Sequence, residues 1–345
     1  MNRVNRPTRP MLRPGLSWGW RSAGTLQFGI DDTSPVIVSG LAPHGPAVIS
    51  LMDGVRTREE VLSTLQTLSP DIDVDAADTV IERLLEVGAV VDGGTWPGGS
   101  GVPAAARARL LPDLMAVAPA EPDRWWQALA TAHVTLIGAS RLGATIASAL
   151  ASAGIGRVTV DDSRPVTASD VTAGGFTSAD LGKPRSSLLA RHPELIALDT
   201  PANPAKHLSV VTDAVDMDTH THSLAAEGVD HLAVSCWERT GRVGPFVRPG
   251  ATACLFCIQL SRRDADAGWA HLWRQRSWSA SPVAHSSVLS VTAHTAVAHI
   301  ISWVTGDVPP STTGVVEISA PHCTSTFRPS QQHPECGCGW VTMAG

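Results

Sequence analysis

Residues 134–162 read VTLIGASRLGATIASALASAGIGRVTVDD, and this stretch decides the fold. The mostly apolar run from Val134 to Ile137 predicts a buried strand. An Ala-rich segment that ends at Ala153 predicts a helix, and the segment from Arg157 to Val160 predicts a second strand. Asp162 stands at the end of that strand. Strand, glycine turn, helix, strand and acid follow one another as in a βαβ unit that binds a nucleotide.

The turn between the strand and the helix matches a nucleotide-binding glycine loop only in part. In the G-x-G-x-x-G pattern, glycines let the backbone approach a phosphate at the helix N-terminus. Here Gly138 and Gly143 frame the turn, but Ser140 replaces the middle glycine and Arg141 follows it. Two interpretations stay open: a phosphate loop in a doubly wound, Rossmann-like α/β sheet, or only a tight strand-to-helix turn.

Upstream of this unit, residues 15–92 are predicted to form a small separate module. We expect strands at 26–30 and 36–38, helices at 47–52, from Thr57 and from near Asp75, and a strand at 89–91. Thr57 followed by Glu60 is the capping-box pattern of a helix start. This order of elements fits a winged helix. We predict that residues 93–104, rich in Gly and Pro, form a linker and that 1–14 are a flexible N-terminus.

Length and charge exclude several classes of protein. The 345 residues suggest two domains, and 43% hydrophobic residues suffice for a sizeable core. The net charge of −6 argues against nucleic-acid binding, because phosphate contacts need clustered Lys and Arg. The most apolar stretch, Val288 to Val304, contains two His and is too short to span a membrane. The first 14 residues lack the apolar core of a signal peptide. We therefore expect a cytoplasmic protein with neither a nucleic-acid nor a membrane partner.

Two local cysteine pairs predict a metal site. Cys254-x-x-Cys257 and Cys336-x-Cys338 could supply four thiolates to a tetrahedral structural zinc. Disulfides are disfavoured in a cytoplasmic chain. Cys323 or His333 could replace one ligand, and four unrelated thiols remain the alternative. We expect His220 and His222 on one side of a strand, without a third metal ligand nearby.

Residues 105–340 resemble the ThiF/MoeB/HesA superfamily, relatives of the ubiquitin-activating enzymes. The resemblance rests on motifs that occur in the same order: the turn 138–143, the stretch from Asp162 to Asp170, Leu181-Gly182-Lys183-Pro184-Arg185, Val211-Thr212-Asp213, the run 243–257 and the tail 333–339. It implies a homodimer with a doubly wound sheet that binds ATP and Mg²⁺ and adenylates a C-terminal carboxylate. It further implies that Gly138 and Gly143 frame the phosphate loop. By the same resemblance Asp162 binds the ribose, Asp213 holds magnesium, and Arg185 replaces a phosphate-binding Lys.

The chain departs from that superfamily at positions that bear on ATP. The superfamily loop is G-x-G-G-x-G, so two glycines are lost here. Residues 171–176 contain no basic residue where the superfamily has an Arg on the γ-phosphate. Residues 258–322 contain no Cys, so the usual thioester position is empty. Arg141 could restore a positive charge or fill the emptied phosphate pocket.

Two further resemblances concern a peptide partner. Leu51-Met52-Asp53-Gly54-x-Arg56-Thr57-x-x-Glu60-Val61 resembles the PqqD-like peptide-binding domain, also called the RiPP recognition element. In that family a leader peptide adds a strand to the sheet edge beside the third helix. The runs 241–245 and 266–275 are similar to actinobacterial cyclodehydratase docking proteins, which present peptides to a separate YcaO enzyme.

These observations leave two hypotheses for the function. The first is a zinc-stabilised ThiF-like scaffold that binds a precursor peptide for a partner enzyme, which Ser140 and the emptied positions favour. The second is an active adenylyltransferase, which Asp162, Asp213 and Arg185 favour.

Overall fold

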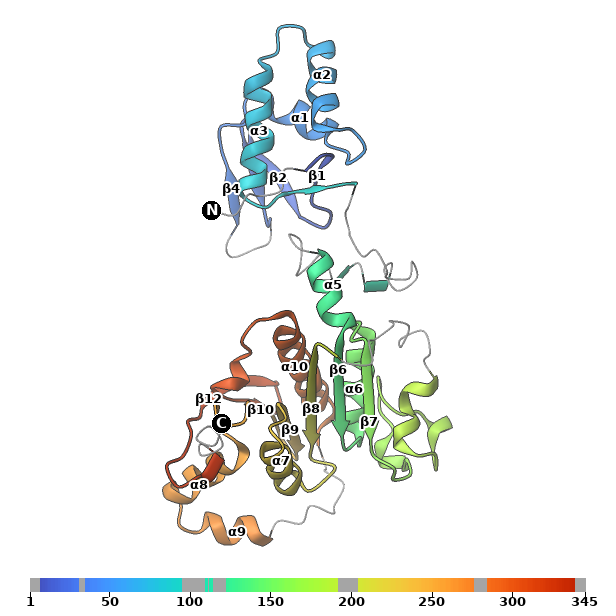
Figure 1. Cartoon of the computed structure of the whole chain (residues 1–345), viewed down its shortest axis with the longest axis vertical. Coiled ribbons are helices and arrows are strands. Elements are labelled where there is room, and N and C mark those ends of the chain that lie inside the picture. The colour runs from blue at the N-terminus through green and yellow to red at the C-terminus, as the bar shows by residue number, and fades with distance from the viewer. Residues whose placement is uncertain are drawn as a thin grey trace. The chain divides into compact units, whose positions relative to one another are not determined.

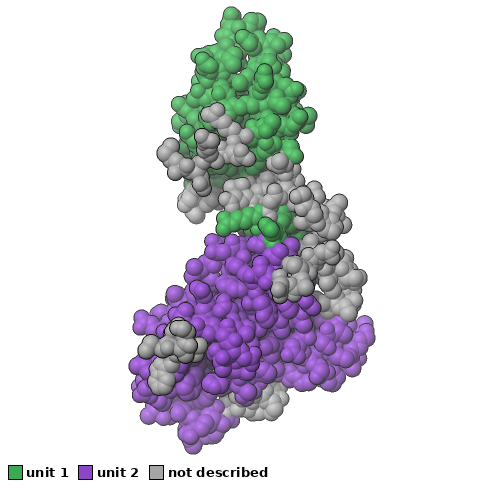
Figure 2. Space-filling model, in the orientation of Figure 1, with its two compact units in different colours: residues 1–127 green, residues 128–345 purple. Residues whose placement is uncertain are grey.

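The computed structural model describes residues 7–30, 35–94, 109–110, 112–113, 122–191, 204–275 and 284–338. The chain divides into two compact units, residues 1–127 and 128–345 (Figure 2). The division falls within helix α5 (Pro122–Ala130). Most of the predicted linker, 93–104, lies outside the described residues, so those domain boundaries stay a prediction.

The first unit combines two small antiparallel sheets with three helices (Figure 1). Its strands are β1 (Pro10–Leu12), β2 (Trp18–Ser22), β3 (Thr25–Phe28), β4 (Val36–Val38) and β5 (Val90–Asp92), and its helices are α1 (Gly45–Leu51), α2 (Arg58–Leu68) and α3 (Val74–Glu86). Strands β2, β3 and β4 form one sheet, and β1 pairs with β5 in the other. Leu26, Leu41, Val61, Ile81 and Leu84 are among the residues of its core.

The strand β1 corrects the expectation of a flexible N-terminus in part. Pro10 pairs with Asp92 and Leu12 with Val90, so residues 10–12 belong to a sheet. Their Pro- and Arg-rich surroundings give no local strand signal. The strand forms because a partner about 80 positions later in the chain supplies its hydrogen bonds.

The expected helix signals of this unit are confirmed. The Thr57 hydroxyl accepts from the Glu60 backbone N–H at 3.2 Å, and the Glu60 carboxylate accepts from the Thr57 N–H at 2.7 Å, which completes the capping box of α2. Helix α3 begins at Val74, where the Asp73 side chain caps it. It ends before Gly88, whose φ of 68° is a conformation that glycine adopts without strain.

The second unit is built on one seven-stranded mixed sheet. Its strands are β6 (Ala132–Ile137), β7 (Arg157–Asp161), β8 (Lys206–Thr212), β9 (His231–Trp237), β10 (Thr240–Val247), β11 (Gly314–Ser319) and β12 (Thr324–Pro329). Their spatial order is β12-β11-β10-β9-β8-β6-β7. Strands β7, β6, β8 and β9 are parallel, and β10, β11 and β12 continue the sheet antiparallel. The predicted α/β class is confirmed, and the antiparallel half is an addition to the predicted sheet.

Two crossover helices give the parallel half its doubly wound character. Helix α6 (Arg141–Ser152) joins β6 to β7, and α7 (Met217–Ala226) joins β8 to β9 in the opposite direction along the sheet. Because such crossovers are right-handed, the two helices lie on opposite faces. The strand order therefore reverses between β6 and β8, and ligands of doubly wound sheets bind beyond the carboxyl ends of the strands at such a point.

Three more helices complete the second unit: α8 (Leu255–Ala265), α9 (Trp269–Gln275) and α10 (Ser286–Thr305). Within the described residues, α10 is the helix whose length and hydropathy would suffice to cross a membrane. It packs against α6, β9 and β10, and Val288, Ala293, Ala296 and Ile300 are buried. These contacts are those of a core helix. His220 and His222 lie on α7 and not on the expected strand.

Candidate functional site

The predicted nucleotide residues meet where the strand order reverses. Gly138 follows β6, Asp162 follows β7 and Asp213 follows β8. Gly138 has a φ of 88°, and a Cβ there would lie 2.8 Å from the Thr212 hydroxyl, which donates to the Gly138 carbonyl at 2.9 Å. A Cβ on Gly143 would collide with that same carbonyl oxygen. Both glycines are therefore required by the close approach of α6 to β6, whether or not a phosphate binds.

The Asp162 carboxylate is fully engaged by groups of the chain itself. It accepts five hydrogen bonds: from the Ala139 N–H at 2.9 Å, from the Arg164 N–H, Nε and Nη2 at 3.1, 2.8 and 2.7 Å, and from Arg185 Nη1 at 3.2 Å. A carboxylate offers about four lone-pair positions. Burial alone raises the pKa of Asp162, but the bonds from Arg164, Ala139 and Arg185 outweigh it and lower the pKa to about 2.

Arg185 contacts the Asp162 carboxylate, and Asp162 and Asp170 together neutralise its guanidinium. Its Nη2 donates to Asp170 at 2.7 Å while Nη1 reaches Asp162, and all three residues are buried. Asp170 also caps the turn that begins at Thr167, from whose N–H and hydroxyl it accepts. Two carboxylates thus balance the guanidinium groups of Arg185 and Arg164. This leaves no net positive charge here for a triphosphate, which needs several cationic contacts.

Asp213, which follows β8, and Arg141, which begins α6, lie near the same switch point. The Asp213 carboxylate is 1% exposed and accepts the backbone N–H of Cys236. Burial raises the pKa of the Cys236 thiol to about 12, which leaves it protonated and unreactive at neutral pH. Arg141 Nη1 donates to the Ala284 carbonyl at 3.4 Å. Arg141 is therefore partly used in a contact between α6 and the segment before α10.

These residues do not fit a bound ATP in the arrangement that the structure shows. The structure places Gly138, Asp162 and Asp213 after neighbouring parallel strands and brings Arg185 to Asp162, and the roles of these residues toward ATP stay a prediction. The acceptor atoms of Asp162 and both hydrogen-bonding ends of the Arg185 guanidinium are, however, already in use. Sequence reasoning missed Arg164. Its signal was a basic residue two positions after the acid at the end of a strand.

The four predicted cysteine ligands converge as one group. Their sulfur atoms lie within 4.8 Å of one another, with Sγ distances of 3.7 Å for Cys254–Cys257, 3.6 Å for Cys254–Cys336 and 3.4 Å for Cys257–Cys338. A tetrahedral centre with Zn–S bonds of about 2.3 Å has edges of about 3.8 Å, so the spacing fits zinc. All four thiols are free and much too far apart for disulfides. The group includes neither Cys323 nor His333.

Local structure holds these sulfurs in place. Cys254 is the residue before α8 and Cys257 lies in its first turn, which puts both sulfurs at one end of that helix. The tail is fixed to α8 by Arg263 with Glu335 at 2.7 Å and by His333 with Asp264 at 2.8 Å. The contact between Cys254 and Cys257 lowers the pKa of Cys257 and raises the pKa of Cys254, so Cys257 more readily becomes the thiolate, the form that binds metal. The group could hold a metal ion that joins the tail to α8.

A second candidate site lies at the edge of the first unit. In the described part of the chain, β4 pairs with β3 and with no other strand. Val36 and Ile37 on this strand are 43% and 48% exposed. Arg83 of α3 donates to the carbonyls of Ser39 and Gly40 at 2.8 and 2.9 Å, which fixes α3 beside the end of β4. The edge therefore offers unpaired backbone groups and apolar side chains next to the third helix.

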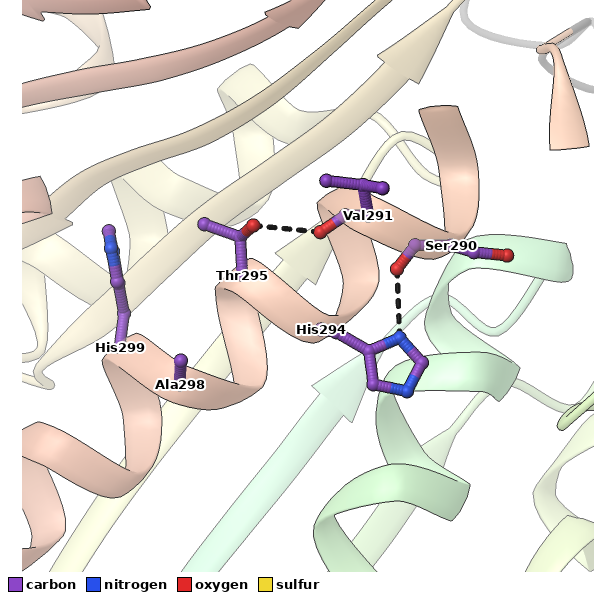
Figure 3. A pocket seen from close by; sticks show the side chains of 6 residues that line it. All are labelled: Ser290, Val291, His294, Thr295, Ala298 and His299. Carbon is purple, nitrogen blue, oxygen red and sulfur yellow. Dashed lines mark hydrogen bonds between the residues drawn. The ribbon is translucent and has the colours of Figure 1, made fainter. Parts of the chain in front are cut away.

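An open depression of about 500 Å³ lies elsewhere, on the surface of α10 (Figure 3). It is lined by Ser290, Val291, His294, Thr295, Ala298 and His299. His294 is bonded to the Ser290 carbonyl at 2.8 Å and Thr295 donates to the Val291 carbonyl, so these polar groups are used within the helix. The depression includes none of the predicted site residues and adds no chemistry to them.

Comparison with known proteins places the second unit in a family. A model of the ThiF family matches residues 113–338. No curated protein matches the chain. Among solved structures, E. coli MccB with MccA-N7isoASN is 15% identical with a TM-score of 0.67, covering 96% of this chain and 99% of that one. E. coli MccB with ATP is 15% identical with a TM-score of 0.66, covering 95% and 99%.

The heterocyclase TruD has a comparable likeness, at 17% identity and a TM-score of 0.61. The match covers 96% of this chain but 43% of TruD, so the chain corresponds to less than half of that protein. At these identities the structural likeness shows the fold alone. The family model covers well over half of the chain, and with the seven-stranded sheet and its switch point it leads to one conclusion: the chain belongs to the ThiF family.

Proposed function

We propose that this chain captures a precursor (leader) peptide at the edge of β4 and presents it to a separate modifying enzyme, such as a YcaO cyclodehydratase. The observation that carries the proposal is the exposed edge strand with its apolar side chains beside α3. An extended peptide can add to such an edge, with main-chain hydrogen bonds supplying affinity and alternate side chains supplying specificity. The similar structures support a peptide partner, since MccB has been crystallised with MccA and with N-formylated MccA.

The state of the second unit supports presentation of a peptide in preference to its adenylation. Asp162 and Arg185 are engaged with each other and with Arg164 and Asp170. We propose that the second unit acts as a scaffold and that the Cys254, Cys257, Cys336 and Cys338 group holds a structural zinc. A centre with four protein thiolates has no open position for substrate, so its contribution is to folding stability.

The alternative function is an active adenylyltransferase that uses ATP and Mg²⁺ on the C-terminal carboxylate of a peptide or carrier protein. Gly138 and Asp213 favour it, because they lie at the switch point where doubly wound sheets bind nucleotides. The two functions separate in one assay. An active enzyme exchanges pyrophosphate into ATP when given its peptide, whereas a scaffold binds the peptide without exchange.

The expected homodimer and cytoplasmic location belong to this proposal. Helix α10 supports a second copy as partner, because its 20 residues include no Asp, Glu, Lys or Arg although part of the helix is exposed. The exposed residues of α10 include Ser286, Ser287, Ser290, His294 and Ala298, so a second copy could cover this face without removing a charged side chain from water.

Fluorescence anisotropy with a labelled candidate leader peptide tests peptide capture at this edge. The variant Val36→Glu/Ile37→Glu should bind the leader at least about tenfold more weakly, because two apolar contacts are replaced by charges. The matched control is Val55→Glu/Leu68→Glu, which changes residues of similar chemistry that are 69% and 70% exposed elsewhere in the unit. Equal affinity of the β4 variant and the wild type would reject this edge as the binding site.

A further inference from the structure

The Arg164 side chain joins two strand ends at the switch point between β6 and β8. Its Nε and Nη2 donate to Asp162 at 2.8 and 2.7 Å, and its Nη1 donates to the Ala214 carbonyl at 2.7 Å. Asp162 follows β7 and Ala214 follows β8, two strands separated in the sheet by β6. One side chain therefore links the strand ends on both sides of β6, the place where a nucleotide lies in a doubly wound sheet.

The bonds from Arg164 occupy the carboxylate oxygens of Asp162, which a nucleoside would need. In this fold the acid at the end of the second strand hydrogen-bonds the ribose hydroxyls. Asp162 is that acid, and three of its five hydrogen bonds come from Arg164. A ribose can reach the carboxylate only if the Arg164 side chain, which supplies two of the five hydrogen bonds, leaves it. The other three donors are the backbone N–H groups of Ala139 and Arg164 and the buried Arg185.

We propose that the guanidinium of Arg164 occupies the carboxylate that would otherwise bind the ribose of a nucleoside. By doing so it excludes adenosine and its phosphates from the switch point. The proposal does not depend on peptide capture by the first unit.

Exposure distinguishes Arg164 from its neighbour Arg185. The Arg164 side chain is 48% exposed, whereas that of Arg185 is 6% exposed and is held by Asp170 as well as Asp162. Removing Arg185 would leave a buried carboxylate without its partner, which is strongly destabilising. Removing the Arg164 side chain exposes Asp162 to solvent, while the Ala139 N–H still donates to it and Arg185 still places a positive charge beside it. A single surface substitution should therefore restore access to the carboxylate.

The experiment measures adenosine binding by isothermal titration to the full chain and to Arg164→Ala. Adenosine is the sharpest probe because it has the ribose but no phosphate, so the loss of loop glycines does not affect it. We expect Arg164→Ala to bind adenosine at least about tenfold more tightly than the wild type, since hydrogen bonds to a charged group are worth about 1.5–3 kcal/mol. The gain should disappear with 2′,3′-dideoxyadenosine, which lacks both hydroxyls.

Two variants control for indirect effects. Arg157→Ala removes an exposed arginine at the opposite end of β7 and should bind adenosine as the wild type does. Arg164→Leu, which keeps an apolar stem but has no donor for Asp162 or Ala214, should reproduce the gain if the alanine variant does not fold. The proposal is overturned if the wild type binds adenosine as tightly as the folded Arg164 variants. It is overturned equally if dideoxyadenosine shows the same gain.

Discussion

At the scale of single residues, the charge of the Asp162 carboxylate contributes to the stability of the second unit. Its pKa lies near 2 in the folded chain, below its ordinary value of 3.8. A lowered carboxyl pKa stabilises the fold above the unfolded pKa, and this contribution is lost as the pH falls through the folded value. The contribution of Asp162 should therefore be complete at pH 7 and should decline from about pH 4 toward pH 2.

The variant Asp162→Asn tests this coupling. We expect it to lower the free energy of unfolding at pH 7 by about 2 kcal/mol or more, because the pKa shift alone corresponds to about that amount and Arg185 loses part of its compensation. The difference between variant and wild type should shrink as the pH approaches 2. Urea unfolding at pH 7, 5 and 3 measures it. A difference that is independent of pH would show that the carboxylate charge is not the cause.

Some residues of the candidate site could be predicted from the sequence, and others could not. The positions of Gly138 and Asp162 were predictable, because a strand, a turn, a helix, a second strand and an acid in succession place them at the ends of parallel strands. Arg185 and Asp213 were named from the family resemblance. The role of Arg164 was not predictable, because its contact with Ala214 joins positions 50 apart and depends on the strand order. The role of Asp170 was not predictable either. Its ion pair with Arg185 depends on how the segment between β7 and β8 folds.

At the scale of elements, the cysteine group joins the tail of the chain to α8. Local spacing predicted the two pairs, and folding brings residues 254–257 and 336–338 together. The helices of the first unit were equally predictable, since Thr57 and Glu60 specify the start of α2 by contacts within one turn. Strands β10 to β12 were not predicted as part of the sheet. Strands β9 and β10 form one hairpin and β11 and β12 another, but β10 and β11 pair although they are distant in the sequence. Strand β12 is exposed and lacks the buried apolar pattern of a core strand.

His220 and His222 illustrate the same limit for a helix. They were expected on a strand, but Asp216 accepts from the N–H groups of Asp218 and Thr219 and so begins helix α7 before them. The signal for the helix was present in the sequence, because Asp is a favoured residue at the position before a helix start.

The cysteine group yields a prediction about metal. The purified chain should contain one zinc per molecule, and Cys254→Ser should lose the zinc and lower the melting temperature of the second unit, because metal binding contributes folding free energy. Cys323→Ser is the matched control, because it changes a thiol in the β11–β12 turn outside the group. This variant should retain the zinc and the melting temperature of the wild type. Metal analysis by mass spectrometry with a thermal melt measures the two effects. A folded wild type without zinc would contradict the assignment.

At the scale of the whole molecule, the chain combines a peptide-binding candidate and a ThiF domain in two separately packed units. The first unit has its own core, and the second has its own sheet and cysteine group. Such a division lets one unit retain a peptide while the other contributes a scaffold for a partner enzyme. The first hundred residues carry 8 Arg against 12 Asp and Glu, which disfavours a strongly acidic leader.

The most direct measurement is the affinity of the leader peptide for the full chain and for a chain that lacks residues 1–92, with zinc content determined for both. Peptide capture by the first unit predicts that the truncated chain keeps its zinc but no longer binds the leader. A truncated, zinc-containing chain that binds the leader as tightly as the full chain would contradict the assignment and place peptide recognition in the ThiF domain.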